Sequence, residues 1–498
     1  MELYLGLDVG TQGTKGLVFD LETSRVVARA SSSYGLIDGL APGAAEQHPD
    51  TWIDAVRAVA AELARSLGPA WSGVRALGVS GQQHGCVVLD SERRVVRPAK
   101  LWCDTETAAE ARELSQRLGR AVPTGFTASK LVWLARHEPE NWRRARHVLL
   151  PHDFVNARLC GELAMECGDA SGTGFFDVHA RRFDARAVAA IDGELAAKLP
   201  RLLAAGEPVG ALDRSGAELL GLPLGVPVSQ GAGDNMASAI GAGATRSGVV
   251  VVSLGTSATV FTRTERPLVD PDGLIAPFCD STGAWLPLLC VMNATGVLEE
   301  VRNAFGVEHA TLTREAAAEP LGARGLVCIP YLQGERVPDL PRATGALLGL
   351  RPGLLRRGLL YRAALEGVTA NLAWGVARLT ELGVAVSRVR VVGGGASNEL
   401  WRGMLADALD AEVETLVESE SGALGAALQA AWSLRRATEK DLPCDALAAV
   451  HVRVSGAPVR PDPERVARWR ELVARFRTSV GAGAASGGST GPSELANS

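Results

Sequence analysis

The pattern of apolar and polar positions contains one feature twice, about half a chain apart. An apolar run typical of a β-strand leads into a turn of glycine, threonine and other small residues. A second run ending in Val-Phe follows, at residues 5–19 and again at residues 251–261. Each copy predicts a β-hairpin with a turn open enough for backbone N–H groups to face an anion. The repetition predicts two similar halves that close on one polyphosphate.

Strand and helix patterns alternate through the rest of the chain, as is typical of an α/β protein. Apolar residues at helical spacing, from Trp52 to Leu63, predict a helix over residues 51–67 with Asp50 and Thr51 as its caps. A buried strand is expected over residues 74–80. Further helices are expected over residues 236–243, 359–381, 399–409 and 423–434, and further strands over residues 388–392 and 412–417.

A polar bend at residues 244–248 predicts the connection between two domains. We therefore expect an N-terminal domain over residues 1–244 and a C-terminal domain over residues 245–480. Residues 481–498 are rich in Gly, Ser and Ala, and this composition predicts a disordered tail.

Composition and charge argue against several classes of protein. The chain has 498 residues, of which 47% are hydrophobic and 21% charged, as in an ordinary globular protein of two or three domains. A net charge of −5 argues against nucleic acid as a partner. No apolar run reaches the length of about 18 residues that indicates a membrane span, and no leader pattern precedes the first strand. These features predict a cytoplasmic protein with neither a membrane nor a nucleic-acid partner.

The glycine turns do not fit two common nucleotide sites. A dinucleotide fingerprint needs a helix after its glycines, whereas the first turn leads into the strand pattern Leu17-Val18-Phe19, and no Walker sequence occurs. Gly393, Gly394 and Gly395 instead join a strand to a helix, where a flat ring can lie against the main chain. This turn predicts an adenosine site with Asn398 as a polar contact; the alternative is a tight packing turn.

Two aspartates follow these small-residue segments. Asp234 comes after Gly231-Ala232-Gly233 and opens a helix of small residues, where a carboxylate could act as the base of a phosphoryl transfer. Asp8 ends the first strand of the first hairpin, and a carboxylate there suits magnesium. The alternatives are that Asp234 is only a helix cap and that Asp8 is only a turn residue.

A polar loop, Gln82-Gln83-His84-Gly85, follows the buried strand. Ligands bind at strand ends in α/β sheets, and Gln83 and His84 can both donate to and accept from sugar hydroxyls. Trp102 and Asp104 could add an apolar wall and a hydroxyl contact, the alternative being core packing and capping. Residues 331–336 carry charges beside an aromatic ring and predict a cleft lining, with a surface ion pair as the alternative.

At these residues the sequence resembles the FGGY carbohydrate kinases, and within them the kinases of D-xylulose. The similarity runs from about residue 1 to residue 476. Its most specific segment is Phe126-Thr127-Ala128-Ser129-Lys130-Leu131-Val132-Trp133-Leu134, and residues 149–154, 169–173 and 345–368 also look like family segments.

The resemblance implies two ribonuclease H-like domains, as in actin and hexokinase, around a central cleft. It implies ATP, Mg²⁺ and transfer of the γ-phosphate to a terminal sugar hydroxyl, with Asp234 as proton acceptor and Asn235 on the sugar beside Gln83 and His84. The positions that match the family's nucleotide and metal motifs are Asp8, Thr11, Gln12, Lys15, Gly255, Thr256, Ser257, Gly394, Gly395 and Asn398.

The Gln82–Gly85 loop favours a ketopentose, D-xylulose most of all, to give D-xylulose 5-phosphate. Glycerol kinases carry an Arg-Glu pair in that region, and this chain does not. Other sugars or polyols, such as ribulose or fuculose, stay open, as does a non-catalytic sugar or nucleotide sensor on the same fold. A chaperone-like ATPase would not need this loop. Dimerisation is common among relatives, so a homodimer is a candidate assembly.

Overall fold

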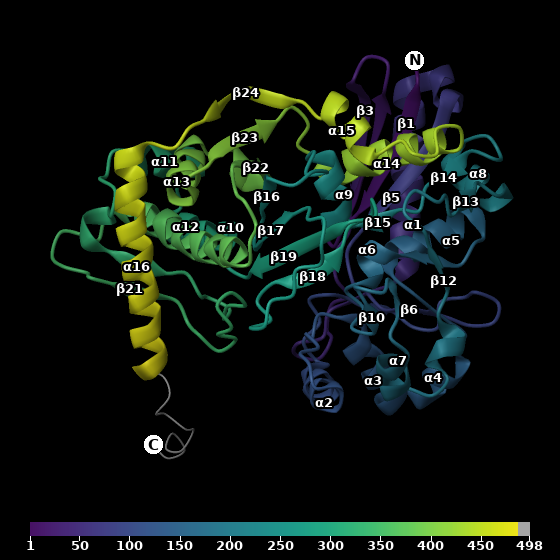
Figure 1. The fold of residues 1–498 in the computed structure, drawn as a ribbon, viewed down its shortest axis with the longest axis horizontal. Coiled ribbons are helices and arrows are strands. Elements are labelled where there is room, and N and C mark those ends of the chain that lie inside the picture. Colours follow the sequence, from purple (N-terminus) through teal and green to yellow (C-terminus); the bar gives the residue numbers. More distant parts are fainter. Residues whose placement is uncertain (487–498) are drawn as a thin grey trace.

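Two seven-stranded mixed sheets form the centres of two lobes (Figure 1). The computed structural model describes residues 1–486. The sheet of the first lobe contains β1 (Leu3–Val9), β2 (Gly13–Asp20), β3 (Arg25–Ser33), β5 (Val74–Gly81), β13 (Gly210–Ala211), β14 (Pro227–Val228) and β15 (Ala232–Gly233). The sheet of the second lobe contains β16 (Val249–Leu254), β17 (Ala258–Thr262), β18 (Ala276–Cys279), β19 (Trp285–Val291), β22 (Arg388–Val392), β23 (Glu412–Leu416) and β24 (Val454–Val459).

The two sheets repeat one strand arrangement. In the first, β1 pairs antiparallel with β2 and parallel with β5. In the second, β16 pairs antiparallel with β17 and parallel with β22. Both predicted hairpins are therefore present at equivalent places, and the prediction of an α/β protein built from two similar halves is confirmed.

Helices cover the faces of both sheets (Figure 1). Those of the first lobe are α1 (Pro49–Leu67), α2 (Ala108–Leu118), α3 (Thr127–His137), α4 (Pro139–Arg144), α5 (Pro151–Cys160), α6 (Cys167–Ala170), α7 (Ala185–Ile191), α8 (Arg214–Leu220) and α9 (Asp234–Gly241). The later helices are α10 (Thr295–Phe305), α11 (His309–Ala317), α12 (Arg357–Glu381), α13 (Glu399–Leu409), α14 (Ser421–Arg436), α15 (Cys444–His451) and α16 (Pro463–Ser486).

Strand β16 shows why an uninterrupted apolar run forms the centre of a sheet. Val250 and Val252 belong to the core cluster that contains α12. Val249 and Val251, which point to the opposite face, belong to the cluster that contains Met236 of α9. Because both faces are covered, every position of the strand interior favours an apolar residue.

Helix α14 crosses from the second half of the chain onto the first lobe. It packs against β1, β5 and α9, and its Ala427 and Leu428 share a core cluster with Tyr4 and Phe19 of the first sheet. The backbones of α9 and α14 are in close contact, since a Cβ on Gly425 would lie 1.8 Å from the Ala237 carbonyl oxygen. The predicted division of the chain at residue 244 did not include this packing of α14 on the first lobe.

Several helix ends differ from the sequence prediction. Helices α9, α12 and α14 each begin two residues earlier than predicted. Helix α1 begins at Pro49 with His48 as its N-cap, so the prediction of Asp50 and Thr51 as caps was wrong; proline suits the first helical position because its missing N–H has no partner there. Helix α16 continues to Ser486, past the predicted start of a disordered tail at residue 481, and residues 487–498 lie outside the described part.

Within residues 1–486, no helix combines the length and the apolar character that crossing a bilayer requires. The residues between α9 and β16, where the sequence predicts the domain connection, form turns and bends.

Candidate active site

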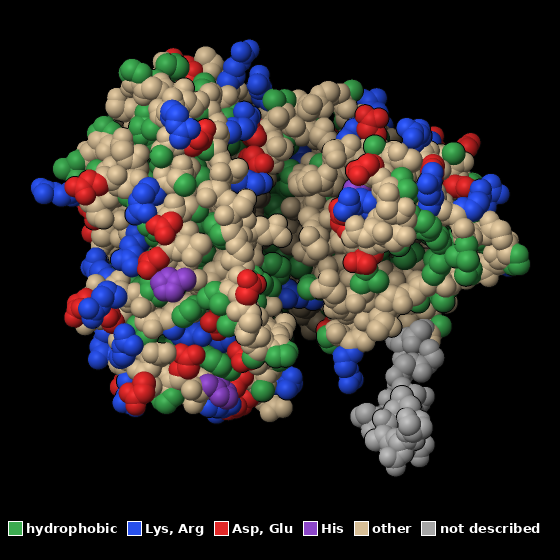
Figure 2. Space-filling model, turned by 180° about the vertical axis from the view of Figure 1, so that it is seen from behind, with side chains coloured by type: hydrophobic (Ala, Val, Ile, Leu, Met, Phe, Trp, Pro, Cys, Tyr) green, Lys and Arg blue, Asp and Glu red, His purple; other side chains and the backbone are tan. Residues whose placement is uncertain are grey.

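Asp234 is the first residue of α9, directly after β15, and the next residue, Asn235, contacts Thr259 of the second lobe. Figure 2 shows that the molecular surface is hollowed between the two lobes. Asp234 Oδ1 accepts hydrogen bonds from the backbone N and the side-chain Nδ2 of Asn235, at 2.7 and 2.8 Å. Burial raises the pKa of Asp234 to about 8, and the negative charges of Asp8 and Asp169 act in the same direction. A carboxyl group with this pKa can take up a proton near neutral pH.

Asn235 connects both lobes. Its Nδ2 donates to Gln83 Oε1 at 2.6 Å, and its Oδ1 accepts from Thr259 Oγ1 of β17 at 2.9 Å. Gln83 also donates through Nε2 to the sulfur of Met236 at 3.2 Å. The predicted residues Gln83, Asp234 and Asn235 therefore form one connected cluster.

His84 stands next to this cluster in an aromatic setting. Its ring lies 5.1 Å from the ring of Phe126 and 5.3 Å from that of Phe278, centroid to centroid. Its backbone φ is 64°, the left-handed region that a non-glycine residue rarely adopts. A Cβ on Gly172 would lie 1.7 Å from His84 Cε1, so the ring occupies space that only glycine leaves open.

A buried network that the sequence analysis missed supports His84. Asp169 Oδ1 lies 3.2 Å from His84 Nδ1, and Asp169 Oδ2 lies 3.1 Å from His152 Nδ1. Burial alone would lower the pKa of His152, but the carboxylates of Asp153 and Asp169 raise it well above its usual value. The imidazolium and its two carboxylates thus compensate one another, as buried charges must. The sequence did contain a signal for this network, namely polar residues inside apolar segments. A buried polar group needs a hydrogen-bond partner, so such residues indicate buried polar contacts.

Lys130 stabilises the loop that carries Phe126, next to His84. It is buried, and its Nζ donates to the carbonyl oxygens of Thr124, Gly125 and Phe126 at 3.1, 2.7 and 2.9 Å. Burial lowers the pKa of Lys130 to about 8. These three bonds fix the loop that places the Phe126 ring against His84.

The side chains of Trp102 and Asp104 have different surroundings in the structure. Trp102 Nε1 donates to Thr11 Oγ1 at 3.0 Å, which joins it to the first hairpin. Asp104 is fully buried, and its Oδ2 accepts from Ala45 N and from Lys100 Nζ at 2.9 and 3.1 Å. Its carboxylate therefore has partners of its own, apart from the cluster around Asp234.

Among residues 1–486, one set of acidic groups has metal-ligand spacing: Glu46, Asp104 and Glu106. Lys100 forms an ion pair with each of them, including Glu46 at 3.0 Å. Arg97 also pairs with Glu46, at 2.7 Å. Because these carboxylates already have cationic partners, we assign the set no metal.

The first hairpin turn faces α14. Asp8 Oδ1 accepts from Ser80 Oγ at 2.6 Å, and burial raises the pKa of Asp8. Lys15 pairs with Glu420 at 2.7 Å, just before α14. Gln12 is exposed at the turn and Thr11 is half-buried. A Cβ on Gly422 would lie 2.6 Å from Asp8 Oδ2, so the glycine leaves room beside this carboxylate.

The second hairpin turn and the triple-glycine turn lie side by side. Gly255 and Thr256 are exposed and Ser257 is half-buried, and the Gly255 and Thr256 carbonyl oxygens accept from backbone N–H groups at the start of α10. A Cβ on Gly395 would lie 2.7 Å from the Cβ of Leu254 at the end of β16, whereas Gly394 faces open space.

Asn398 caps α13. Its Oδ1 accepts from Trp401 N and its Nδ2 donates to Thr313 Oγ1, both at 3.1 Å. The alternative reading of this residue as part of a packing turn therefore has direct support, and its role at a nucleotide stays a prediction.

Arg336 of the second lobe is exposed and reaches the first. Its Nη2 would lie 3.9 Å from a Cβ on Gly125. Burial raises the pKa of the Cys290 thiol, while Arg336 opposes that shift and Asp234 adds to it. The charges of Arg336 and Asp234 therefore both act on Cys290, and within the described residues Arg336 pairs with no carboxylate.

Family models match both lobes. The N-terminal domain of the FGGY family of carbohydrate kinases matches residues 3–241, and its C-terminal domain matches residues 250–434. The chain belongs to the FGGY family of carbohydrate kinases. It is an ATP-using phosphotransferase whose acceptor is a hydroxyl group, and the predicted actin- and hexokinase-like fold around a central cleft is confirmed.

Relatives of this kinase share most of its length. A xylulose kinase of Haemophilus influenzae is 40% identical over 86% of this chain and 90% of its own length. A xylulose kinase of Escherichia coli is 35% identical over 95% of this chain and 98% of its own. The solved structure of xylulose kinase from Rhodospirillum rubrum has a TM-score of 0.86 at 31% identity and covers 97% of this chain and 99% of that one.

Proposed function

We propose that this kinase phosphorylates D-xylulose on its 5-hydroxyl group to give D-xylulose 5-phosphate. The observation that carries the proposal is the cluster of Gln83, Asn235 and Asp234, in which donors and acceptors surround a carboxyl group of raised pKa between the lobes. Support for this sugar comes from relatives of the same length that are named xylulose kinase.

In this mechanism Asp234 accepts the proton of the sugar hydroxyl as its oxygen bonds to the γ-phosphorus. The bond between that phosphorus and the β,γ-bridging oxygen breaks, and ADP leaves. Gln83, His84 and Asn235 hold the sugar's other hydroxyls, and the half-buried Trp102 closes one side of the pocket. Asp104, with its carboxylate on Lys100, would act by holding the loop after Trp102.

ATP would lie between the two hairpin turns. The first turn supplies Thr11, Gln12 and Lys15, and the second supplies Gly255, Thr256 and Ser257, each through groups that suit phosphate oxygens. Gly394 and Gly395, with Asn398 at the start of α13, would hold the adenosine. The contact between Gly395 and Leu254 supports this order, because it joins the adenosine turn to the second phosphate turn.

Asp8 fits a magnesium ion. Ser80 takes only Oδ1, and Gly422 leaves space beside Oδ2. Mg²⁺ is usually held by one or two carboxylates, waters and substrate phosphates, and a single aspartate meets that need. The ion would neutralise charge on the β- and γ-phosphates. A homodimer and a cytoplasmic location stay predictions.

A sugar panel tests the proposal. Turnover with ATP would be compared for D-xylulose, ribulose, fuculose, gluconate and glycerol, and we expect kcat/KM to be highest for D-xylulose by about tenfold or more. A higher value for another sugar would replace the substrate. A flat response to every sugar would favour a non-catalytic sensor, and sugar-independent ATP turnover would indicate another kind of ATPase.

A further inference from the structure

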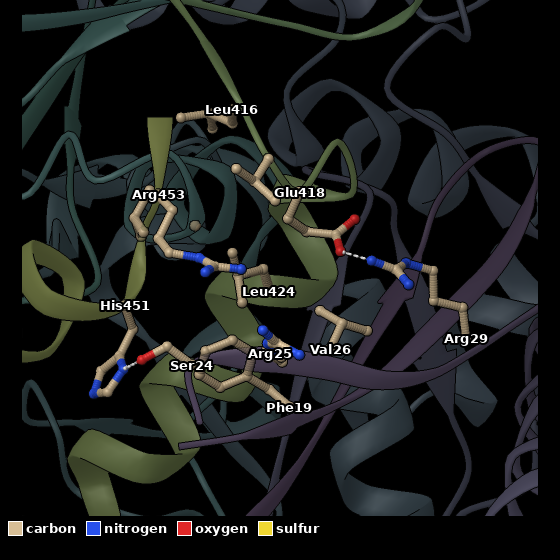
Figure 3. A pocket seen from close by; sticks show the side chains of 13 residues that line it. Phe19, Ser24, Arg25, Val26, Arg29, Leu416, Glu418, Leu424, His451 and Arg453 are labelled. Carbon is tan, nitrogen blue, oxygen red and sulfur yellow. Dashed lines mark hydrogen bonds and ion pairs between the residues drawn. The ribbon is translucent and has the colours of Figure 1, made fainter. Parts of the chain in front are cut away.

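A cavity of about 230 Å³ lies where the edges of the two sheets approach each other (Figure 3). Arg25 and Arg29 of β3 line it from the first lobe, and Glu418 and Arg453 line it from segments beside β23 and β24. None of its lining residues belongs to the active site described above. Gly241, which also lines it, is at the opposite end of α9 from Asp234, about 10 Å along the helix.

The cavity carries an excess of positive charge. Three guanidinium groups line it against one carboxylate, and Glu418 is already paired with Arg29. Arg25 and Arg453 point into the cavity, and neither has an acidic partner among the described residues (Figure 3). Both residues are exposed, so solvent weakens the repulsion between their guanidinium groups, and both groups are free to bind an anion.

The neutral lining is also suited to a small ligand. Ser24 Oγ lies 2.8 Å from His451 Nδ1, at the side of the cavity. Burial lowers the pKa of His451, so its ring is neutral and the charge comes from the arginines. Phe19, Val26 and Leu424 give an apolar wall against which a few carbon atoms can pack.

We propose that this cavity binds a small phosphate monoester, with the phosphate between Arg25 and Arg453 and a short carbon chain on the apolar wall. The excess of two positive charges matches a phosphate dianion, and guanidinium groups form paired hydrogen bonds with phosphate oxygens. The volume admits a ligand of triose to pentose size and is smaller than a nucleotide site requires.

The bound ester would be held by both lobes. Arg25 belongs to the first sheet, and Arg453 immediately precedes β24 of the second. Gly241 and Leu424 place α9 and α14, the two helices that cross between the lobes, in the same wall. The site therefore lies beside the connection of the lobes, and its existence does not depend on which sugar the kinase uses.

Calorimetric titration of the full chain tests this site. The probes are glycerol 3-phosphate and inorganic phosphate, and the proteins are the wild type, Arg25→Ala/Arg453→Ala, the two single variants, and Arg144→Ala as a matched control. Arg144 is an exposed arginine of α4 whose side chain has no partner in residues 1–486. Thermal unfolding of each variant verifies that it is folded.

We expect the wild type and Arg144→Ala to bind glycerol 3-phosphate equally. The double variant should bind at least about tenfold more weakly, because it loses the charge-assisted hydrogen bonds of both guanidinium groups. Each single variant should lose part of that affinity. If the wild type binds inorganic phosphate as tightly as glycerol 3-phosphate, the result would support the site, with free phosphate as its occupant. An unchanged affinity in the double variant, or no binding of either probe to the wild type, would overturn the proposal.

Discussion

At the scale of single residues, the proposed mechanism depends on Asp234 and its neighbours. The same burial that makes the carboxyl a strong base also keeps it protonated until about pH 8 in the absence of ligands. Below its pKa the group already holds a proton and cannot accept one from a sugar. Catalysis should therefore depend on pH in a range where an ordinary aspartate would be fully ionised.

The pH profile of kcat/KM tests this. We expect the value for the wild type to rise with pH and to level off above an apparent pKa of about 8, because kcat/KM reports groups of the free enzyme. The measurement is steady-state kinetics with Mg²⁺ ATP and sugar both well below saturation, from about pH 6 to about pH 10. A profile that is flat from pH 6 upward would show that no such group limits the reaction.

Gly172 gives a test of His84. In Gly172→Ala the new Cβ would lie 1.7 Å from His84 Cε1 and must displace the ring. If His84 binds the sugar, we expect the sugar KM to rise about tenfold or more, with kcat less affected. Gly193→Ala is the control, since a Cβ there meets nothing within 4 Å. Equal KM values in the two variants would remove His84 from the sugar site.

At the scale of elements, what the sequence could predict depends on whether the cause is local. Hairpins β1–β2 and β16–β17 follow from alternation and glycine turns, and the structure has them where predicted. The small-residue helix predicted over residues 236–243 is also present, but it begins two residues earlier, at Asp234. Helix α13 matches its predicted range at both ends. The N-cap of α1 was missed because Pro49 shifts the helix start to a residue outside the apolar pattern.

The missed features depend on contacts between distant parts of the chain. His84 and Asp169 are far apart in sequence, and no local pattern pairs them. Gly172 looks like an ordinary loop glycine until the ring beside it is seen. The same holds for α14, whose small residues indicate close packing but do not say against which sheet.

The close contact between α9 and α14 leads us to a prediction about the stability of the protein. In Gly425→Ala the added Cβ would lie 1.8 Å from the Ala237 carbonyl oxygen, so the helices must separate, and we expect a loss of about 2 kcal/mol or more in the free energy of unfolding. Gly403→Ala on α13 meets nothing within 4 Å and should be neutral or slightly stabilising, by up to about 1 kcal/mol. Urea denaturation measures both; equal stabilities would show that the crossing tolerates a wider spacing.

At the scale of the whole molecule, the proposed site takes different groups from the two lobes. Asp8, Gln83, His84 and Asp234 lie in the first lobe, while Thr259 and Arg336 lie in the second. A reaction that needs both sets requires the lobes to be close together when ATP and sugar are bound, which also excludes water as an acceptor.

Arg336 tests this cooperation of the lobes. Its guanidinium is near Cys290 and Gly125, and we propose that it contacts the charge that develops on the phosphoryl group. We expect Arg336→Ala to lower kcat by about 10- to 100-fold and Arg336→Lys to recover part of that loss. Arg351→Ala, at an exposed arginine of the same lobe, is the control. An unchanged kcat in Arg336→Ala would contradict this prediction and would show that Arg336 of the second lobe takes no part in the reaction.

The most direct test of the account is a comparison of wild type and Asp234→Asn by single-turnover kinetics and by sugar binding. Asparagine keeps the size of the side chain and one oxygen that can accept both bonds from Asn235, but it cannot take up the proton. We predict that turnover falls by about 10³-fold or more while the Kd for D-xylulose changes by less than about threefold. A variant that keeps most of its turnover would contradict the assignment of Asp234 as the base.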